Sequence, residues 1–360
     1  MLDQNIFKNE EKAVFALRSL YRQYGYLPYK MSKFEDYEYY IRNKDFLVSD
    51  RIITFNDTNG RLLALKPDVT LSIIKNGEDI PGCKQKVYYN ENVYRVSEST
   101  GQFKEIMQAG LECIGDIDTY DIFEAVFLAA KSLSLISEDF VLQVSHLGIL
   151  SKALDMTCKD KAFQQQAMEY IAQKNAHDLS RLCNQYGVED TLLVQLVGAY
   201  GQRSKVLSQL EEMGCLEPAL QELSELLDET PWADQIVFDF SLVNNRRYYN
   251  GIAFRGFLSG ISESVLAGGQ YDKLMQKLER RSGAIGFALY LDLLEQLPTE
   301  KSGYDVDVLL LYEAETEKTM IAKAVSQLIA EGKTVSAQKN VPQKLRYRQL
   351  MRLSKEGRVC

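Results

Sequence analysis

Residues 105–115 read EIMQAGLECIG, and the alternation of residue types in this stretch predicts a β-strand. One face of the strand is apolar throughout and consists of Met107, Ala109, Leu111 and Cys113. The opposite face carries Gln108, Gly110 and Glu112. A solvent-exposed sheet face accounts for the two polar residues as well as a ligand site does. Gly110 slightly favours a ligand, because glycine weakens a strand and often marks the close approach of another group.

The two polar side chains of this strand have a spacing that suits a small zwitterion. Gln108 and Glu112 are four positions apart in the sequence. At ~3.3 Å per residue they lie ~13 Å apart along the strand. They can therefore hold opposite ends of one molecule, with Glu112 accepting a charge-assisted hydrogen bond from an ammonium group.

The segments that precede residue 135 predict both strands and helices. Near the N-terminus, a helix is indicated by side chains at spacings of three and four, which are Val14, Leu17, Tyr21 and Tyr24. Asn59 and Gly60, in the middle of residues 51–65, predict a β-hairpin. Residues 86–96 predict a further strand, and residues 118–135 predict a helix.

The second half of the chain contains a helical segment between two groups of strands. Residues 152–229 are helical in period, rich in Gln, Leu and Glu, and predict a helical insertion. Strands resume in residues 235–243 and 248–257. Residues 267–272 predict a turn that enters a helix, and residues 284–297 predict a helix that ends at a proline. This order of elements argues for the α+β class.

A linker of Pro, Thr, Glu, Lys, Ser and Gly at residues 298–303 suggests a domain boundary. We therefore expect one domain over residues 1–303, which includes the helical insertion, and a short C-terminal α/β extension over residues 304–360. The chain of 360 residues leaves room for two or three folding units.

Composition and charge restrict the classes of function. Hydrophobic residues make up 46% and charged residues 26% of the chain, as in ordinary globular proteins. The 42 basic and 50 acidic residues give a net charge of −8, which argues against a dedicated nucleic-acid-binding protein. The six cysteines form no C-x-x-C pair, and there are only two histidines, so we expect no metal site and no disulfide framework.

The same features predict where the protein resides. Scattered cysteines favour reduced thiols in the cytoplasm. The acidic start of the chain lacks the pattern of a signal peptide, and no apolar run approaches the ~18 residues that a membrane span needs. We therefore expect a cytoplasmic protein.

Four further residues stand in segments that are ambiguous when each is taken alone. Asp68 and Thr70 follow a predicted strand, and Asp and Thr are equally common in turns and helix caps. Tyr249 lies at what could be a hairpin corner, and Tyr271 lies at the predicted turn before a helix.

The order of these segments resembles the histidyl-tRNA synthetase family over residues 8–297. The segments that carry the resemblance are LKPDVT (65–70), VYRVSESTGQFKEIMQAGLECIG (93–115), LVNNRRYYNGIAF (242–254), AGGQYDKLM (267–275) and GAIGFALYLDLL (283–294). The resemblance implies a class II aminoacyl-tRNA synthetase-like antiparallel sheet flanked by helices. The helical insertion stands at the position where the family has one.

The resemblance also implies roles for individual residues. It places a histidine ligand on the strand of Gln108 and Glu112, with its ammonium group at Asp68 and Thr70. The imidazole pocket falls at the two tyrosines, so the implied histidine-binding residues are Asp68, Thr70, Gln108, Glu112, Tyr249 and Tyr271. Arg95 matches the arginine that binds the α-phosphate of ATP in the family, which makes it a candidate for residual phosphate binding.

Three departures from the family pattern concern the activation of histidine by ATP. Leu293 stands where the family has the arginine that clamps the γ-phosphate, and leucine supplies neither the charge nor the fork of donors. Tyr290 replaces a nearby glycine with a bulky group. Asn244 stands where the family has the arginine that stabilises the attacked carboxylate.

A kept histidine pocket without the adenylation arginines resembles the regulatory subunits of ATP phosphoribosyltransferase, a family of synthetase paralogues. This resemblance implies a chain without catalytic activity or cofactor that pairs with a short catalytic subunit. The complex performs the first step of histidine biosynthesis and is inhibited by L-histidine. The resemblance further implies a homodimer within a hetero-oligomer, with no membrane and no tRNA as partners.

Two other interpretations remain open at this point. The first is a divergent but working histidyl-tRNA synthetase, which Leu293, Asn244 and the short C-terminal extension disfavour. The second is a synthetase paralogue that binds another amino acid or another partner.

Overall fold

The computed structural model of the protein describes residues 7–44, 47, 52–77, 82–96, 100–242, 249–298 and 303–354. The chain divides into two units, Met1–Leu297 and Pro298–Cys360. This division lies at the start of the predicted linker of residues 298–303, whereas the predicted boundary lies at its end.

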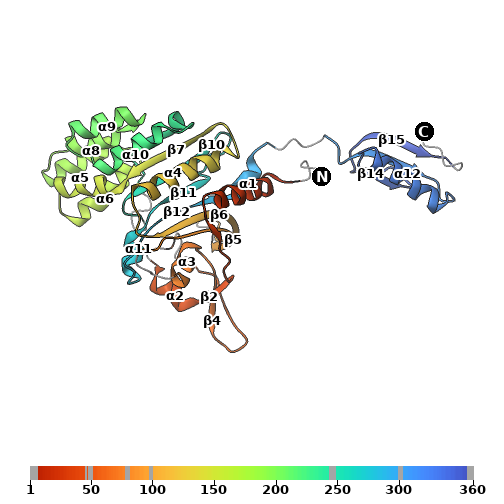
Figure 1. Ribbon diagram of the computed structural model, residues 1–360, viewed down its shortest axis with the longest axis horizontal. Coiled ribbons are helices and arrows are strands. Elements are labelled where there is room, and N and C mark those ends of the chain that lie inside the picture. Colours follow the sequence, from red (N-terminus) through yellow and green to blue (C-terminus); the bar gives the residue numbers. More distant parts are fainter. Residues whose placement is uncertain are drawn as a thin grey trace. The chain divides into compact units, whose positions relative to one another are not determined.

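A nine-stranded sheet runs through the described part of the first unit (Figure 1). In spatial order its strands are β1 (Leu27–Pro28), β5 (Gln85–Val96), β6 (Phe103–Gly115), β12 (Gly283–Tyr290), β11 (Leu266–Gln270), β10 (Ile252–Leu258), β7 (Phe140–His146), β9 (Ile236–Asp239) and β8 (Tyr200–Gly201). Neighbouring strands are antiparallel, except that β1 is parallel to β5 and β7 is parallel to β9. The predicted α+β class is confirmed.

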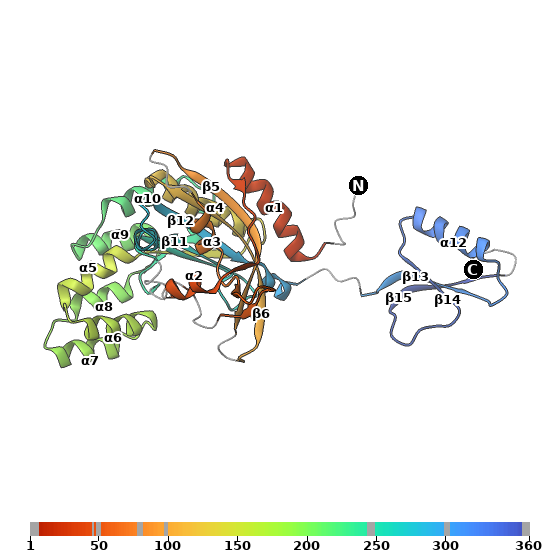
Figure 2. The same ribbon diagram turned by 90° about the horizontal axis from the view of Figure 1, so that it is seen from below.

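Helices α1 (Asn9–Gln23) and α4 (Thr119–Ser134) cover one face of this sheet (Figure 2). The predicted apolar stripe of α1 lies in the core, where Leu17 and Tyr21 are buried. Asp118 caps α4 by accepting a hydrogen bond from the Asp121 backbone N–H at 3.1 Å. The apolar face of β6 meets these helices, so the large core of the unit lies on this side of the sheet.

A smaller layer covers part of the opposite face (Figure 1). It contains the three-stranded sheet of β2 (Phe34–Asp36), β4 (Leu62–Leu65) and β3 (Thr54–Asn56), and the helices α2 (Tyr37–Arg42), α3 (Thr70–Asn76) and α11 (Asp272–Lys277). The predicted hairpin is confirmed, because β3 and β4 are antiparallel and Gly60 adopts φ +78° in the turn between them. A second core, which includes Leu71, Tyr89 and Leu274, joins this layer to the sheet.

The segment between β7 and β9 is helical, as predicted. Its helices are α5 (Leu147–Thr157), α6 (Lys161–Ala172), α7 (Ala176–Tyr186), α8 (Thr191–Gly198), α9 (Arg203–Glu212) and α10 (Pro218–Asp228). Their leucines, among them Leu179 and Leu223, are buried in the same core as the sheet, and α10 contacts α4. The insertion is therefore packed onto the sheet domain. Its first helix begins at Leu147, earlier than the predicted limit of residue 152.

The prediction of a helix over residues 284–297 was wrong. Residues Gly283–Tyr290 form strand β12, and a 3₁₀ helix, η4, follows over Leu291–Gln296. Strand β12 lies in the middle of the sheet and is buried on both faces, so its sequence is a continuous apolar run that periodicity alone does not separate from a buried helix. The predicted turn at residues 267–272 likewise contains strand β11, followed by α11.

The second unit is a small α/β fold. Its strands β13 (Val306–Tyr312), β14 (Val335–Gln338) and β15 (Tyr347–Leu353) form a sheet in the order β14-β13-β15, and both pairs are parallel. Helix α12 (Lys318–Ala330) packs Ala324 and Leu328 against the buried side chains of β13.

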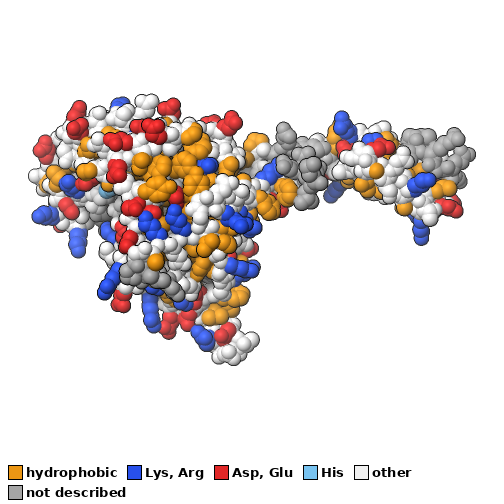
Figure 3. Space-filling model, in the orientation of Figure 1, with side chains coloured by type: hydrophobic (Ala, Val, Ile, Leu, Met, Phe, Trp, Pro, Cys, Tyr) orange, Lys and Arg blue, Asp and Glu red, His pale blue; other side chains and the backbone are white. Residues whose placement is uncertain are grey.

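Within the described residues, no helix combines the length and the apolar content needed to cross a bilayer. Acidic and basic side chains are interspersed over the visible face of the first unit (Figure 3).

Removal of the Phe287 ring tests the core beneath the sheet. Phe287 is 1% exposed, and its ring lies 6.1 Å from that of Tyr21 and 6.2 Å from that of Phe254. We expect Phe287→Ala to lower the free energy of unfolding by about 3–5 kcal/mol, because it leaves a cavity. Denaturant titration followed by the fluorescence of Trp232, the single tryptophan of the chain, measures this.

The control is Phe103→Ala on the same sheet, where the side chain is 74% exposed. This variant should change the free energy by no more than about 0.5 kcal/mol. Equal losses in the two variants would contradict the assignment of Phe287 to the core.

Candidate functional site

The polar face of β6 is buried in the space between the sheet and the smaller layer. Glu112 is 2% exposed and Gln108 is 3% exposed, although neither lies on the apolar face of the strand. A solvated sheet face is therefore excluded for both residues. Buried polar groups need partners, so this face of the sheet is the candidate site.

Two hydroxyl groups from distant segments hold the carboxyl group of Glu112. Thr70, the first residue of α3, donates from Oγ1 to Glu112 Oε1 at 2.7 Å. Tyr271, which precedes α11, donates its phenolic hydroxyl to Glu112 Oε2 at 2.6 Å. Gly286 stands opposite Glu112 in the sheet, and a Cβ atom there would lie 1.8 Å from Oε2. The absence of a side chain at Gly286 thus makes room for the carboxyl group.

The protonation of Glu112 is strongly perturbed. Burial raises the pKa of its carboxyl group to about 8, and the negative charge of Asp68 acts in the same direction. The hydrogen bonds from Tyr271 and Thr70 favour the ionised form and oppose this rise. A cation that enters next to Glu112 would favour ionisation further, so the arrangement suits a ligand with an ammonium group.

Asp68 lies beside this group at the start of α3. Its Oδ1 accepts a hydrogen bond from the Leu71 backbone N–H at 2.9 Å, which pairs one N–H of the first turn of α3, although the N-cap position itself is Val69. Burial raises the pKa of the Asp68 carboxyl group, while the Leu71 N–H and the charge of Arg95 lower it. Capping does not exclude a ligand role, because a carboxylate accepts several hydrogen bonds.

Arg95 connects β5 to the segment that leads into α3. Its Nε donates to the backbone carbonyl of Pro67 at 2.9 Å. This contact places the guanidinium group near Asp68, whose pKa it lowers. The residue therefore supports the geometry of the site, and phosphate binding by Arg95 stays a prediction.

Tyr249 lies on the same side of the sheet. A Cβ atom at Gly269 would lie 2.9 Å from Tyr249 Cδ1, so the ring rests on this glycine. Burial raises the pKa of Tyr249 well above its ordinary value, and Tyr290, Glu112 and Asp68 contribute to the rise, which places Tyr249 near these three groups.

The segment that carries Tyr249 is tied to the start of α11. The next residue, Asn250, donates a side-chain hydrogen bond to Asp272 at 3.0 Å. Asp272 directly follows Tyr271, so this contact brings the two predicted tyrosines to neighbouring segments of the site.

The structure thus brings Asp68, Thr70, Glu112, Tyr249 and Tyr271 together. Gln108 shares their face of the sheet but lies further along β6, where it is in register with Tyr290.

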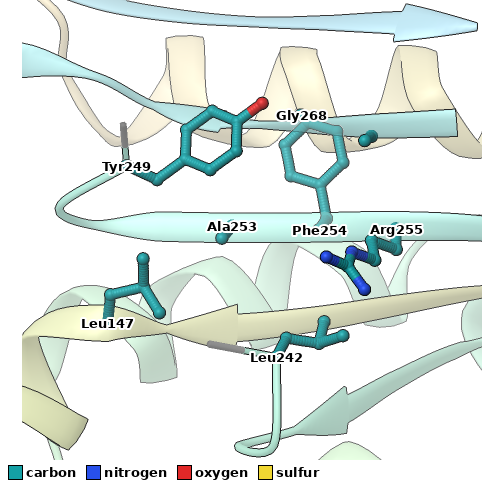
Figure 4. Close-up of a pocket in the computed structure, with 8 residues that line it drawn as sticks. Leu147, Leu242, Tyr249, Ala253, Phe254, Arg255 and Gly268 are labelled. Carbon is teal, nitrogen blue, oxygen red and sulfur yellow. The ribbon is translucent and has the colours of Figure 1, made fainter. Parts of the chain in front are cut away.

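A small hollow of about 10 Å³, enough for about one water molecule, continues from Tyr249 along β10. It is lined by Leu147, Leu242, Tyr249, Ala253, Phe254, Arg255, Ala267 and Gly268 (Figure 4). Arg255 was not among the predicted site residues, although it is the single charge within the apolar strand IAFRGFL. Within the described ranges, no cluster of three or more His, Cys, Asp or Glu side chains is placed to hold a metal ion.

The residues that depart from the family pattern have clear locations in two of three cases. Leu293, in η4, packs against the large apolar core. Tyr290 is in register with Gln108 on the polar face of the sheet, so its ring stands beside the site. Asn244 lies outside the described residues.

Comparison with known proteins identifies the family. A family model described as histidyl-tRNA synthetase matches residues 2–294. The chain belongs to the histidyl-tRNA synthetase family.

Two curated relatives of this family member are named ATP phosphoribosyltransferase regulatory subunit. The one from Oceanobacillus iheyensis is 28% identical, over 81% of this chain and 75% of the relative. The one from Clostridium kluyveri is also 28% identical, over 86% of this chain and 84% of the relative. The predicted resemblance to these regulatory subunits is confirmed.

Solved structures support the same fold for this synthetase-family chain. An ATP phosphoribosyltransferase regulatory subunit/histidyl-tRNA synthetase from Bacillus halodurans matches with a TM-score of 0.73 and 20% identity, over 98% of this chain and 96% of that chain. An ATP phosphoribosyl transferase complex from Thermotoga maritima matches with a TM-score of 0.63 and 21% identity, over 79% of this chain and 98% of that chain. The predicted class II synthetase-like fold is confirmed.

The titration of Glu112 tests the electrostatics of the site. We expect the carboxyl ¹³C resonance of Glu112, assigned with Glu112→Gln, to titrate near pH 8. Tyr271→Phe should move the midpoint to higher pH, because it removes a hydrogen bond that stabilises the ionised form.

Tyr21→Phe is the matched control, since its buried hydroxyl lies 3.1 Å from Ser132 in the core on the other face of the sheet. It should leave the midpoint unchanged. A midpoint near the ordinary value for glutamate, about 4.3, would contradict the buried environment.

Proposed function

We propose that this chain is the regulatory subunit of an ATP phosphoribosyltransferase and that it senses L-histidine. It works with a short catalytic subunit at the first step of histidine biosynthesis. The observation that carries the proposal is the buried Glu112 carboxyl group, held by Thr70 and Tyr271, in a chain whose adenylation position is occupied by Leu293. The names of the relatives from O. iheyensis and C. kluyveri support it.

The arrangement around Glu112 supports a ligand that is a free amino acid. In our proposal the ammonium group of histidine lies at Glu112, with Asp68 and Thr70 beside it, because two buried carboxyl groups compensate a positive charge. Tyr249 and Tyr271 line the imidazole ring, since both phenol rings lie on this side of the sheet. Gln108 supplies a polar contact further along β6.

The proposed subunit has no catalytic activity of its own. Leu293 packs into the core and offers no charge to a γ-phosphate, and the bulk of Tyr290 stands beside the site. Loss of one electrostatic group that stabilises a transition state typically lowers a rate by ~10²–10³-fold. Loss of two such groups, at positions 293 and 244, leaves amino-acid binding without adenylation.

The proposal also covers the location of the protein in the cell, its assembly and its partners. We place it in the cytoplasm, which agrees with the free thiols of Cys83, Cys113, Cys158, Cys183 and Cys215. We propose a homodimer within the hetero-oligomer, since two-fold dimers are the commonest symmetric assemblies. The interspersed surface charges and the net charge of −8 support the exclusion of tRNA as a partner (Figure 3).

Calorimetry with L-histidine on the isolated chain tests the proposed ligand. We expect Glu112→Ala to weaken binding by about 1.5–3 kcal/mol, or roughly 10–100-fold, because it removes a charge-assisted hydrogen bond. Glu105→Ala is the matched control, an exposed glutamate on the same strand, and should leave the dissociation constant unchanged. An unchanged constant in Glu112→Ala would remove Glu112 from the binding site.

Inhibition of the reconstituted complex tests the proposed regulation. A regulator must bind histidine more tightly in the inhibited state, and typical coupling free energies of ~1–3 kcal/mol correspond to a 5–150-fold change in affinity. We expect the Glu112→Ala complex to assemble normally and to stay active at histidine concentrations that silence the wild-type complex. Identical inhibition of both complexes would place the sensor on the catalytic subunit and would make this chain an assembly factor.

A further inference from the structure

Both tyrosines of the site lie just outside the regular strands of the sheet. Tyr271 follows Gln270, the last residue of β11, and Tyr249 lies three positions before Ile252, the first residue of β10. The ladder of backbone hydrogen bonds that fixes a strand residue from both sides therefore ends before either tyrosine. Further contacts must hold the two segments where the site requires them.

The side chain of Asp272 continues the pairing of β11 with β12 after β11 has ended. Its Oδ1 accepts a hydrogen bond from the Ala284 backbone N–H at 3.0 Å. The backbone N–H of Tyr271 donates to the carbonyl oxygen of the same Ala284 at 2.9 Å. A Cβ atom at Gly283 would lie 3.0 Å from Oδ1, so the glycine leaves room for the carboxyl group. Asp272 thus acts in place of a strand carbonyl and fixes the start of α11 against β12.

The other carboxyl oxygen of Asp272 reaches the segment of the second tyrosine. Its Oδ2 accepts a hydrogen bond from Asn250 Nδ2 at 3.0 Å. The Oδ1 atom of Asn250 accepts in turn from the Lys273 backbone N–H at 3.4 Å. Asn250 directly follows Tyr249, and Asp272 directly follows Tyr271. The Asn250–Asp272 pair is therefore a bridge between the residues next to the two tyrosines.

The hydrogen bond of Tyr271 depends on the backbone that this bridge holds. Its hydroxyl group donates to Glu112 Oε2 at 2.6 Å. The hydroxyl lies at the far end of the ring, so a small rotation of the backbone displaces it by a larger distance. Hydrogen bonds weaken steeply outside a narrow range of distance and angle. A change in the Asn250–Asp272 pair therefore reaches the carboxyl group of Glu112.

We propose that Asp272 and Asn250 are positioning residues of the binding site, which act through Tyr271 and Tyr249. The bridge holds the hydroxyl of Tyr271 on Glu112 and keeps the ring of Tyr249 beside it. This inference rests on the proposed function for the identity of the ligand, because it names residues that shape the same site.

Exchange of the two polar groups tests the proposal on the full chain. An amide has one acceptor oxygen, so Asp272→Asn sets a donor either against the Ala284 N–H or against the amide group of Asn250. The double variant, Asp272→Asn with Asn250→Asp, restores a donor opposite an acceptor at both contacts. The single variant should therefore disturb the site, and the double variant should repair it.

The titration of Glu112 without ligand is the first measurement. Asp272→Asn should move the midpoint to higher pH, as Tyr271→Phe does, because the displaced hydroxyl no longer stabilises the ionised form. Removal of a carboxyl group that acted only through its charge would lower the midpoint instead. The double variant should return the midpoint to the wild-type value. Asp272→Asn in a Tyr271→Phe background should cause no further rise, since the hydroxyl through which it acts is absent.

Calorimetry with L-histidine is the second measurement. Asp272→Asn should weaken binding about 10-fold, the usual effect of one misplaced hydrogen bond, and the double variant should recover most of the affinity. Asp160→Asn is the matched control, because Asp160 also accepts a hydrogen bond in the first turn of a helix, from the Phe163 N–H of α6. It should change neither the midpoint nor the affinity.

A Glu112 midpoint that does not rise in Asp272→Asn, or that the double variant does not restore, would overturn the proposal. If Asp272→Asn does not fold, Asn250→Ala removes the bridge without opposing two donors, and its midpoint decides in the same way. Failure of wild type to bind histidine would overturn the proposed function alone, because the titration of Glu112 needs no ligand.

Discussion

The buried carboxyl group of Glu112 is the constraint on which the arrangement of the site depends. It joins three segments that are far apart in the sequence, because its partner Thr70 begins α3 and its partner Tyr271 precedes α11. A carboxyl group in this environment is stable only when its oxygens accept hydrogen bonds, so both helices must begin where they do. Gly286 is part of the same constraint, since any side chain there would collide with the carboxyl group. The smaller layer is thus held to the sheet at a polar contact as well as through its apolar core.

The two faces of the central sheet perform different tasks. The face toward α1 and α4 carries large apolar side chains such as Leu111 and Phe287, which belong to the large core of the first unit. The opposite face combines small residues with a few charged ones, which leaves space above the strands. Because successive side chains along a strand point to opposite faces, the same strands supply both the apolar face and the face with small and charged residues. Substitutions on the first face are therefore expected to act on folding, and substitutions on the second face on binding.

Local patterns in the sequence predicted local features well. Alternation in residues 105–115 separated Gln108 and Glu112 from the core, and Asn59-Gly60 marked a real hairpin. The helix predicted over residues 284–297 failed because β12 is apolar on both faces. The contact of Glu112 with Tyr271 spans 159 residues, and no local pattern encodes such a pairing. Only the resemblance to a family assigned both residues to one predicted site, and it did not predict the contact itself.

The protonation of Glu112 has a further consequence for any ligand that carries an ammonium group. Because burial raises the pKa of the Glu112 carboxyl group to about 8, a proton competes with an ammonium group for this carboxylate near neutral pH. An ammonium group pairs with the ionised carboxylate, so its arrival must expel this proton. Ligand uptake is then an exchange of one cation for another, and acidification below pH 8 competes with the ligand. The affinity of this site for a ligand with an ammonium group is therefore expected to fall as the pH falls.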